Sequence, residues 1–364
     1  MHNPKSKIEN PKFPAPAPVV FVVPGDLHLT SPGLENHRAA LWMVDDVNQW
    51  IRPDFVQFIG DNVQHAAVEE FELFGDLCRR LKTPYYALVG DHDVHRDPQA
   101  ARFRSFVGEP YAATSQGGFR FIRLNTLEHQ PLGMSWDQIL WFRGQLDAAA
   151  SAGERAIVFQ HHYPFKVYEQ FDGPGIDDWR GIVQSARIGA IFAGHTHYGQ
   201  IANDGRNVAI ATRSIGDPEG GPPGYTVAYV QGEDLAVAYR SIEDRGPLAL
   251  ITHPRELLLA TGPEHVVSGT DELRVRVWSR ESIASVQGRF FDGPWFPLEP
   301  RGADRWSCTL PGDRMAKGQH VCDVRVADRF GAETTARLTF LVDPTGRYTP
   351  VPGAWPTVKA TAFC

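Results

Sequence analysis

Apolar residues in the first 245 positions fall into two kinds of stretch. Short continuous runs with the length and the β-branched or aromatic content of buried strands occupy residues 19–25, 55–60, 85–90, 119–126, 156–160 and 190–194. Between them, apolar side chains recur every three or four residues, as on one face of a helix, in 136–146 and at Val68, Phe71, Phe74, Leu77 and Leu81. Strands that alternate with helices predict a layered α/β fold.

The pattern changes after residue 245. Further β-type runs continue through 201–246, but from there on no long helical pattern occurs, and short alternating runs follow one another at steps of roughly ten residues. These short alternating runs predict a second, smaller all-β sandwich domain of immunoglobulin-like type. We therefore expect a flexible lead-in over 1–18, an α/β domain over 19–245, the sandwich over 246–345 and an extended tail over 346–364.

Composition and charge narrow the possible partners. The chain has 364 residues, 42% of them hydrophobic, and a formal net charge of −7. Such a balance gives no basic surface for nucleic acid or an anionic membrane, and no apolar run is long enough to span a bilayer. The Pro-rich start lacks the apolar core of a secretion signal. We expect a cytoplasmic protein that acts on a small molecule, with its oligomeric state left open.

The four cysteines form no CxxC metal motif. Cys308 and Cys322 are placed where they could face each other across a hairpin, and we interpret them as free thiols rather than a disulfide. The tryptophans of the second domain, Trp278, Trp295 and Trp306, are either core residues or a binding surface for a sugar or a partner, and we favour the core.

Carboxylates and imidazoles follow five of the predicted strands of the first domain. They stand in "PGDLH" (24–28), "IGDNV" (59–63), "VGDHD" (89–93), "FQHHYP" (159–164) and "AGHTH" (193–197). Ligands of open α/β sheets bind outside the carboxyl ends of the strands, so these side chains are expected to meet. Each motif alone is more typical of a turn or a helix cap, but five in succession favour a binding site.

Oxygen and nitrogen ligands without sulfur suit Mn, Fe, Zn or Co. The ligands are too many for one tetrahedral zinc, and they fit two ions about 3.5–4 Å apart that share one carboxylate. The sequence therefore predicts a dinuclear metal site with two divalent or transition metal ions.

The order of these motifs resembles the calcineurin-like metallophosphoesterase superfamily over roughly residues 19–240. The matching residues are Asp26-Leu27-His28, Gly60-Asp61, Gly90-Asp91-His92-Asp93, His162 and Gly194-His195-Thr196-His197. The resemblance implies a four-layer α/β/β/α sandwich with the metals at the strand ends. In motif spacing the chain looks most similar to class III cyclic-nucleotide phosphodiesterases and purple acid phosphatases.

The resemblance also implies roles for individual residues. Asp26, His28 and His197 would hold one metal, His162, His195 and Asp91 the other, and Asp61 would bridge them. His162 is preferred to His161 because His162-Tyr163-Pro164 fits the H-x-P pattern of the family. His92 would protonate the leaving oxygen or stabilise the phosphoryl group, and Asp93 would orient His92. Asp91 departs from the family pattern, which has asparagine there.

The implied function is hydrolysis of a phosphoester, foremost a phosphodiester, by a metal-bound hydroxide. A phosphomonoesterase, a hydrolase of another ester and a non-catalytic scaffold remain as alternatives, and His92 favours an enzyme because a scaffold needs no histidine beyond its ligands. Arg213 and Asn62 are candidates for contacts with a substrate phosphate, whereas His65 and His95 are expected at the rim.

Overall fold

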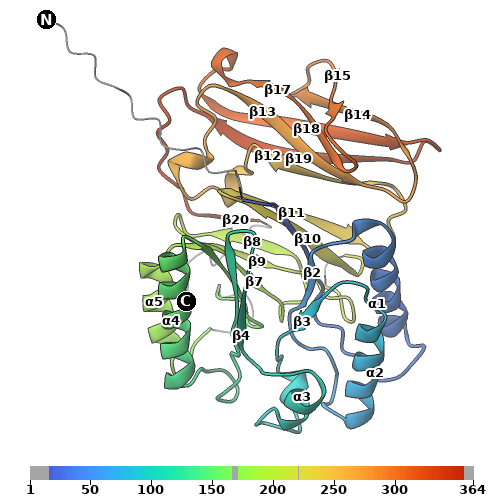
Figure 1. Ribbon diagram of the computed structural model, residues 1–364, viewed down its shortest axis with the longest axis vertical. Helices are drawn as coiled ribbons and strands as arrows, with labels where there is room; N and C mark the ends of the chain where they lie inside the picture. Colours follow the sequence, from blue (N-terminus) through green and yellow to red (C-terminus); the bar gives the residue numbers. More distant parts are fainter. Residues whose placement is uncertain (1–15, 166–170, 220, 356–364) are drawn as a thin grey trace, which may run out of the picture.

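The computed structural model describes residues 16–165, 171–219 and 221–355. Most of the predicted lead-in, residues 1–15, and the last part of the predicted tail, residues 356–364, lie outside the described residues. Figure 1 shows an α/β part, drawn from blue to yellow, beneath a β part drawn in orange and red.

Five strands form the first sheet, in the order β11 (Asp234–Ser241), β10 (Gly224–Gln231), β1 (Val19–Val23), β2 (Phe55–Phe58) and β3 (Tyr85–Ala87). Strands β1, β2 and β3 run parallel to one another, and β10 runs antiparallel to β1. The carboxyl ends of the three parallel strands therefore meet at one edge of the sheet.

Seven strands form the second sheet, in the order β20 (Gly353–Trp355), β8 (Gln200–Asn203), β9 (Val208–Ala211), β7 (Ile188–Ala193), β6 (Arg155–Phe159), β5 (Phe119–Arg123) and β4 (Ala112–Gln116). Strands β5, β6, β7 and β9 are parallel. Part of the predicted tail is thus an edge strand, because β20 pairs with β8.

Helices cover the outer faces of both sheets. Helices α1 (Glu35–Asp46), which continues as a π-helical turn over Val47–Ile51, and α2 (Val68–Arg79) pack on the first sheet, and the short α3 (Ala101–Phe106) lies beside α2. Helices α4 (Trp136–Ala152) and α5 (Ile176–Ser185) cover the second sheet. Helix α4 begins where the Ser135 side chain accepts the Gln138 N–H and ends at Gly153, whose φ is 67°.

The side chains of β1 alternate between two cores, as a strand buried on both faces requires. Val20 and Val22 belong to the apolar cluster that includes α1 and α2, whereas Phe21 points between the two sheets. There Phe21 stacks on Phe55 with 5.1 Å between ring centroids and meets Phe159 edge-on at 5.7 Å. The predicted four-layer α/β/β/α architecture is confirmed.

The C-terminal part consists of two four-stranded antiparallel sheets. One has the order β12 (Leu248–His253), β13 (Thr270–Trp278), β17 (Arg305–Pro311) and β16 (Glu299–Pro300), and the other β15 (Phe296–Pro297), β14 (Ile283–Phe290), β18 (Gly318–Asp328) and β19 (Glu333–Val342). Short 3-10 turns occur at Leu257–Leu259, Pro263–His265 and Gly312–Arg314. The predicted second β domain is confirmed, while its limits at residues 246 and 345 stay a prediction.

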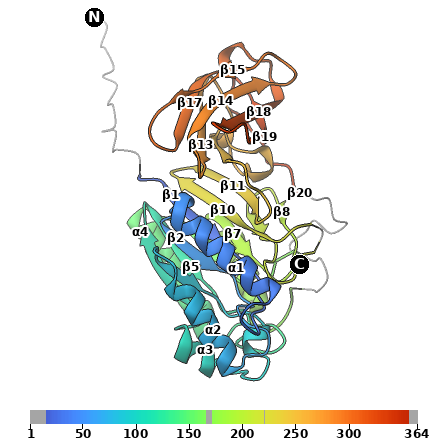
Figure 2. The same cartoon turned by 90° about the vertical axis from the view of Figure 1, so that its right-hand side faces the viewer.

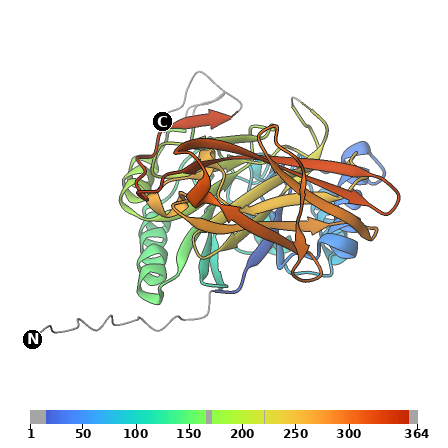
Figure 3. The ribbon, with the colours of Figure 1, turned by 90° about the horizontal axis from the view of Figure 1, so that it is seen from above.

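The sandwich packs directly on the α/β layers. Leu248, Leu250 and Trp278 share an apolar cluster with Tyr225 and Tyr229 of β10. Figure 2 shows β11 at this junction, and the view from above in Figure 3 shows the C-terminal strands spread over the sheets beneath them. Trp278 is therefore a core residue, as expected, and it lies at the junction of the two parts.

The remaining tryptophans lie in two kinds of surroundings, and the described cysteines are unpaired with one another. Trp306 packs against the core of the sandwich, whereas the Trp295 ring lies 4.7 Å from the Arg289 guanidinium and 4.6 Å from that of Arg325. Cys78, Cys308 and Cys322 are free, as expected, and Cys364 lies outside the described residues. Within the described ranges, no helix combines the length and hydropathy needed to cross a bilayer.

Candidate metal centre

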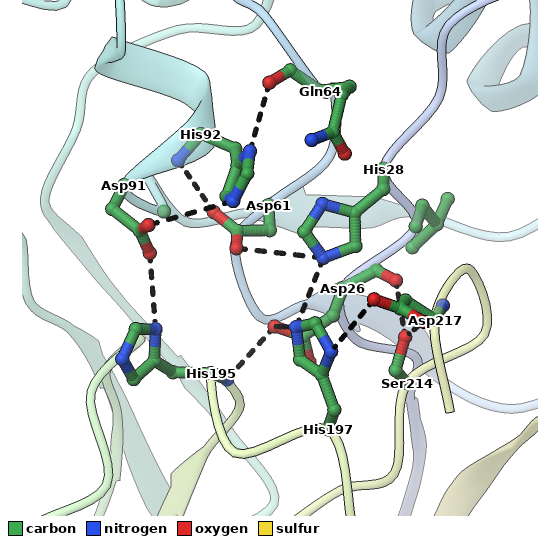
Figure 4. Close-up of polar contacts among 12 residues, drawn as sticks. Asp26, His28, Asp61, Gln64, Asp91, His92, His195, His197, Ser214 and Asp217 are labelled. Atoms are coloured by element: carbon green, nitrogen blue, oxygen red, sulfur yellow. Dashed lines mark hydrogen bonds and ion pairs between the residues drawn. The ribbon is translucent and has the colours of Figure 1, made fainter. Parts of the chain in front are cut away.

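The strand-end motifs meet in one cluster at the carboxyl ends of the strands, and Figure 4 shows residues from four of the five motifs. Four side chains place one ligand atom each within 4.8 Å of one another: Asp26, His28, Asp61 and His197. They follow β1, β2 and β7, which lie in different sheets. The cluster therefore depends on the packing of one sheet on the other.

A second group of four lies beside the first and shares Asp61 with it. Its members are Asp61, Asp91, His161 and His195. Asp91 Oδ1 is 3.0 Å from His161 Nε2 and 3.1 Å from His195 Nδ1, and Asp61 Oδ1 is 3.5 Å from His161 Nε2. A carboxylate common to two ligand groups is the arrangement that a bridging ligand requires.

The polar atoms of the first group fit a cation. His28 Nε2 and His197 Nε2 are 3.1 Å apart, and two imidazole nitrogens at that separation need a shared proton or a positive ion between them. Asp26 Oδ2 is buried without a hydrogen-bond partner among the described residues. Buried groups of this kind are costly unless they are paired or bind a metal, so the donor set suits a transition metal.

The backbone at this cluster is strained in a consistent way. Asp26, His28, Asp61, His195 and His197 all have φ between 48° and 65°, although none is glycine. They are five of the nine non-glycine residues with positive φ in the described chain. Aspartate and histidine tolerate this conformation better than most residues, and strained conformations gather at functional sites because the surrounding structure has to impose them.

Two glycines of the motifs are required by close approach. A Cβ on Gly90 would overlap the Asp61 carboxylate, and a Cβ on Gly60 would overlap the His161 ring. The glycine that precedes an acidic residue in "IGDNV" and "VGDHD" thus leaves room for another side chain of the cluster.

Charges in the cluster depend on one another. Burial alone would raise the pKa of Asp91, but hydrogen bonds from His161 and His195 hold it well below its ordinary value. Burial likewise opposes ionisation of Asp61, and the adjacent His161 outweighs it and lowers the pKa of that carboxyl. Both carboxylates are therefore favoured in the ionised form, the form in which a carboxylate binds a metal, and the imidazoles beside them would have to be neutral to bind as well.

His92 belongs to neither group of candidate ligands. Its Nδ1 lies 2.9 Å from the Gln64 carbonyl oxygen, and its Nε2 lies 3.8 Å from Asp91 Oδ2 (Figure 4). The side chain is 33% exposed, so it lies at the open side of the cluster. This placement suits a residue that meets a substrate.

Asp93 does not orient His92, contrary to the expectation. Its carboxylate accepts hydrogen bonds from the N–H groups of Asn62, Val63 and Gly90, at 3.0, 3.1 and 2.9 Å, and from the Asn62 amide at 2.8 Å. Burial, with the Asp61 charge adding to it, raises the pKa of Asp93 to about 7 against these bonds. Asp93 therefore holds together the two loops that carry Asp61 and Asp91, and Gln64 holds His92.

The histidine pair after β6 also differs from the expectation. His161 lies in the second ligand group, with its Nδ1 2.9 Å from the Ile59 carbonyl oxygen. His162 is outside that group, and its Nδ1 is 2.7 Å from the Thr126 hydroxyl. The geometry thus favours His161 and does not support the preference for His162.

The other candidates take structural or peripheral places. Asn62 is fully buried and bonded to Leu88 and Asp93, so it is not available to a substrate. Arg213 faces a separate cavity, described below. His65 pairs with Glu70 at 2.9 Å, and His95 is exposed, in agreement with a rim position for both.

Two partners of the cluster carry no sequence motif. Ser214 Oγ donates to the Asp26 carbonyl oxygen at 2.7 Å, and the Asp217 carboxylate lies 3.7 Å from His197 Nδ1 (Figure 4). They come from the loop after β9, which sequence reasoning did not connect with the site. A carboxylate beside a ligating histidine is a common supporting contact in metal sites.

Known proteins resemble this chain in sequence and in fold. The calcineurin-like phosphoesterase family matches residues 19–199. A probable glycerophosphodiester phosphodiesterase, GpdQ, of Arcobacter nitrofigilis is 24% identical over an alignment of 199 residues that covers 49% of this chain and 72% of that protein.

Solved structures share the fold at low sequence identity. A dimetal phosphatase of Danio rerio is similar with a TM-score of 0.53 and 12% identity, over 62% of this chain and 97% of that one. The purple acid phosphatase PPD1 of yellow lupin, Lupinus luteus, has a TM-score of 0.50 and 14% identity, over 63% of this chain and 52% of that one. The solved structures show a shared fold, and the family match shows that residues 19–199 form a domain of the calcineurin-like phosphoesterase family.

Proposed function

We propose that the protein is a dinuclear metal-dependent phosphodiesterase. The observation that carries the proposal is the pair of ligand groups that share Asp61. Asp26, His28 and His197 would hold one ion, and Asp91, His161 and His195 the other, with Asp61 between them. When bound, two such ions supply Lewis-acid stabilisation of charge at phosphorus and an activated water.

The protein's own residues would divide the remaining work. His92 is held by the Gln64 carbonyl through Nδ1, which leaves Nε2 to give a proton to the leaving oxygen or to stabilise the phosphoryl group. Asp93 fixes the distance between the loops of Asp61 and Asp91. The site would thus combine a fixed frame with one partly exposed proton donor.

Asp91 supports a preference for diesters over monoesters. It adds a third carboxylate to Asp26 and Asp61, where the asparagine of the family pattern would add none. The extra negative charge disfavours a doubly charged monoester more than a singly charged diester. The likeness to a probable glycerophosphodiester phosphodiesterase agrees with this choice.

The test is a substrate panel with protein loaded separately with Mn, Fe, Zn or Co. We expect a higher kcat/KM for bis(4-nitrophenyl) phosphate than for 4-nitrophenyl phosphate, and a smaller ratio in Asp91→Asn. Faster monoester hydrolysis in the wild type would instead indicate a phosphomonoesterase. Binding of metal without hydrolysis of any ester would indicate the scaffold alternative.

A further inference from the structure

A cavity of about 680 Å³ lies between the α/β layers and the C-terminal sandwich. Strands β8, β9, β11, β12 and β19 contribute to its wall, together with the turn at Leu257–Leu259. The apolar side chains of the wall include Ile201, Ile210, Val237, Leu250, Leu258 and Leu338. Its volume is within the range of about 300–1,000 Å³ that is typical of small-molecule sites.

The cavity explains an irregularity in the burial of the two sheets. Ile201 of β8 and Val237 of β11 pack against the apolar cluster between the sheets, yet both are only partly buried. Tyr239, two residues after Val237 on the same strand, is also only partly buried. Apolar groups that keep access to solvent inside a fold favour an apolar ligand, which would remove that surface from water.

Arg213, a cation in the wall, forms no ion pair with a carboxylate in the part of the chain that the structure describes. Arg213 Nε is buried without a hydrogen-bond partner among the described residues. Its guanidinium lies 4.9 Å from the centre of the Tyr239 ring, and Nη1 is 3.5 Å from the Pro222 carbonyl oxygen, a weak contact. Arg240, also in the wall, has an Nε without a hydrogen bond as well, but this atom lies 4.0 Å from the Asp46 carboxylate. Asp244, an acidic residue of the wall, is exposed.

The charged end of the cavity is adjacent to the metal centre. Gly199, in the wall, follows His197 by two residues, and Arg213 directly precedes Ser214. The Ser214 N–H donates to the His197 carbonyl oxygen at 3.3 Å, and Ser214 Oγ donates to the Asp26 carbonyl oxygen. A molecule that pairs with Arg213 would therefore have its charged head beside the segments that carry two candidate metal ligands.

We propose that this cavity binds an amphiphilic anion, with its alkyl or acyl chain among the apolar side chains and its anionic head on Arg213. Arg213 is partly buried, and its Nε meets no acceptor among the described residues, so an anion held next to it by an apolar chain would fill both that donor and the apolar wall. The anion is either a phosphodiester substrate, whose apolar part would occupy the cavity, or a separate ligand. The site itself does not depend on the proposed activity.

The test uses decanesulfonate as the probe and calorimetry on the full chain, without turnover. Methanesulfonate is the head without the tail, and decanol is the tail without the head. We expect decanesulfonate to bind at least tenfold more tightly than either. Arg213→Gln should weaken decanesulfonate about tenfold and leave decanol unchanged, with the exposed Arg143→Gln as the matched control. Val237→Phe, which fills the cavity, should weaken both decanesulfonate and decanol.

A second filling variant, Ala238→Leu, guards against misfolding of Val237→Phe, and circular dichroism checks both. The proposal is overturned if affinity does not depend on the alkyl chain, or if folded filling variants bind decanesulfonate as well as the wild type does.

Hydrolysis then separates the two sources of the ligand. For a series of 4-nitrophenyl alkyl phosphates, a substrate tail in the cavity predicts that KM falls at least tenfold from methyl to decyl in the wild type but not in Val237→Phe. A separate ligand predicts decanesulfonate binding with no such dependence on chain length. If no ester is hydrolysed, the proposed function is wrong. The calorimetry with decanesulfonate still shows whether the cavity binds an amphiphilic anion.

Discussion

The backbone N–H of His92 donates a hydrogen bond of 3.0 Å to Asp61 Oδ1. The proposed proton donor is thereby attached to the carboxylate that the two ligand groups share. A ligand change at Asp61 should consequently disturb both metals and the position of His92, whereas a change of the His92 side chain leaves this backbone contact in place. The first two predictions use this difference.

Metal content should approach two ions per chain after dialysis against metal-containing buffer. Asp61→Ala should reduce it to well below one, because both groups lose a member. Elemental analysis measures the ratio, and His65→Ala, at the rim, is the control. A wild-type value of one or less under saturating metal would rule out the dinuclear site.

His92→Ala should keep the metal content of the wild type and lower kcat by roughly 10²–10⁴, the usual contribution of a positioned acid or base. The loss should be smaller for a nitrophenolate leaving group, which needs less protonation than an alkoxide. Steady-state kinetics with both substrate types provide the comparison, with His95→Ala as the matched variant. Loss of metal from His92→Ala would show that His92 is a ligand.

The two adjacent histidines after β6 should behave differently. His161→Ala should lose about one metal ion per chain, because His161 Nε2 lies 3.0 Å from Asp91. His162→Ala should retain both ions, since His162 lies in neither group of candidate ligands. Metal titration of the two purified variants decides between them, and the opposite result would restore His162 as the ligand.

His253 should make the junction of the two parts sensitive to alkaline pH. Its Nδ1 and Nε2 each lie 2.9 Å from a carboxylate, that of Asp234 in β11 and that of Asp271 in β13. Burial lowers the pKa of His253, but the hydrogen bonds to Asp234 and Asp271 outweigh it and raise the pKa to about 9. Arg274 also pairs with Asp234, at 2.8 Å.

Because the folded pKa is above the ordinary value of about 6.5, the stabilisation is complete below pH 6.5 and is lost as the pH rises through 9. The shift corresponds to roughly 3 kcal/mol at most. Thermal unfolding at pH 6.5 and pH 10 should show a larger fall of Tm in the wild type than in His253→Gln. Equal falls would mean that the imidazolium does not link the two parts.

Much of the fold was readable from the sequence because its signals are local. Short apolar runs predict strands, and apolar residues spaced by three or four predict helices. The run at β1 is apolar throughout because Val20 and Phe21 point to opposite faces of the strand and each face packs against its own apolar layer. Asp26, Asp61 and His195 were likewise accessible, since each follows a predicted strand directly. Their assignment as metal ligands stays a prediction.

Only the tertiary structure showed which face of a strand is the inner one and which loops contact each other. Ile157 and Phe159 face the space between the sheets and Val158 faces the helices, so His161 continues the inner face, and His162 does not. Alternation was visible in the sequence, but only the packing shows which face is the inner one. Asp93 bonds the loop of Asn62, 31 residues away in the chain, and the cavity beside Arg213 exists only where the sandwich covers the sheet edges. Contacts between distant segments are set by the packing of layers, and no local pattern of side chains encodes them.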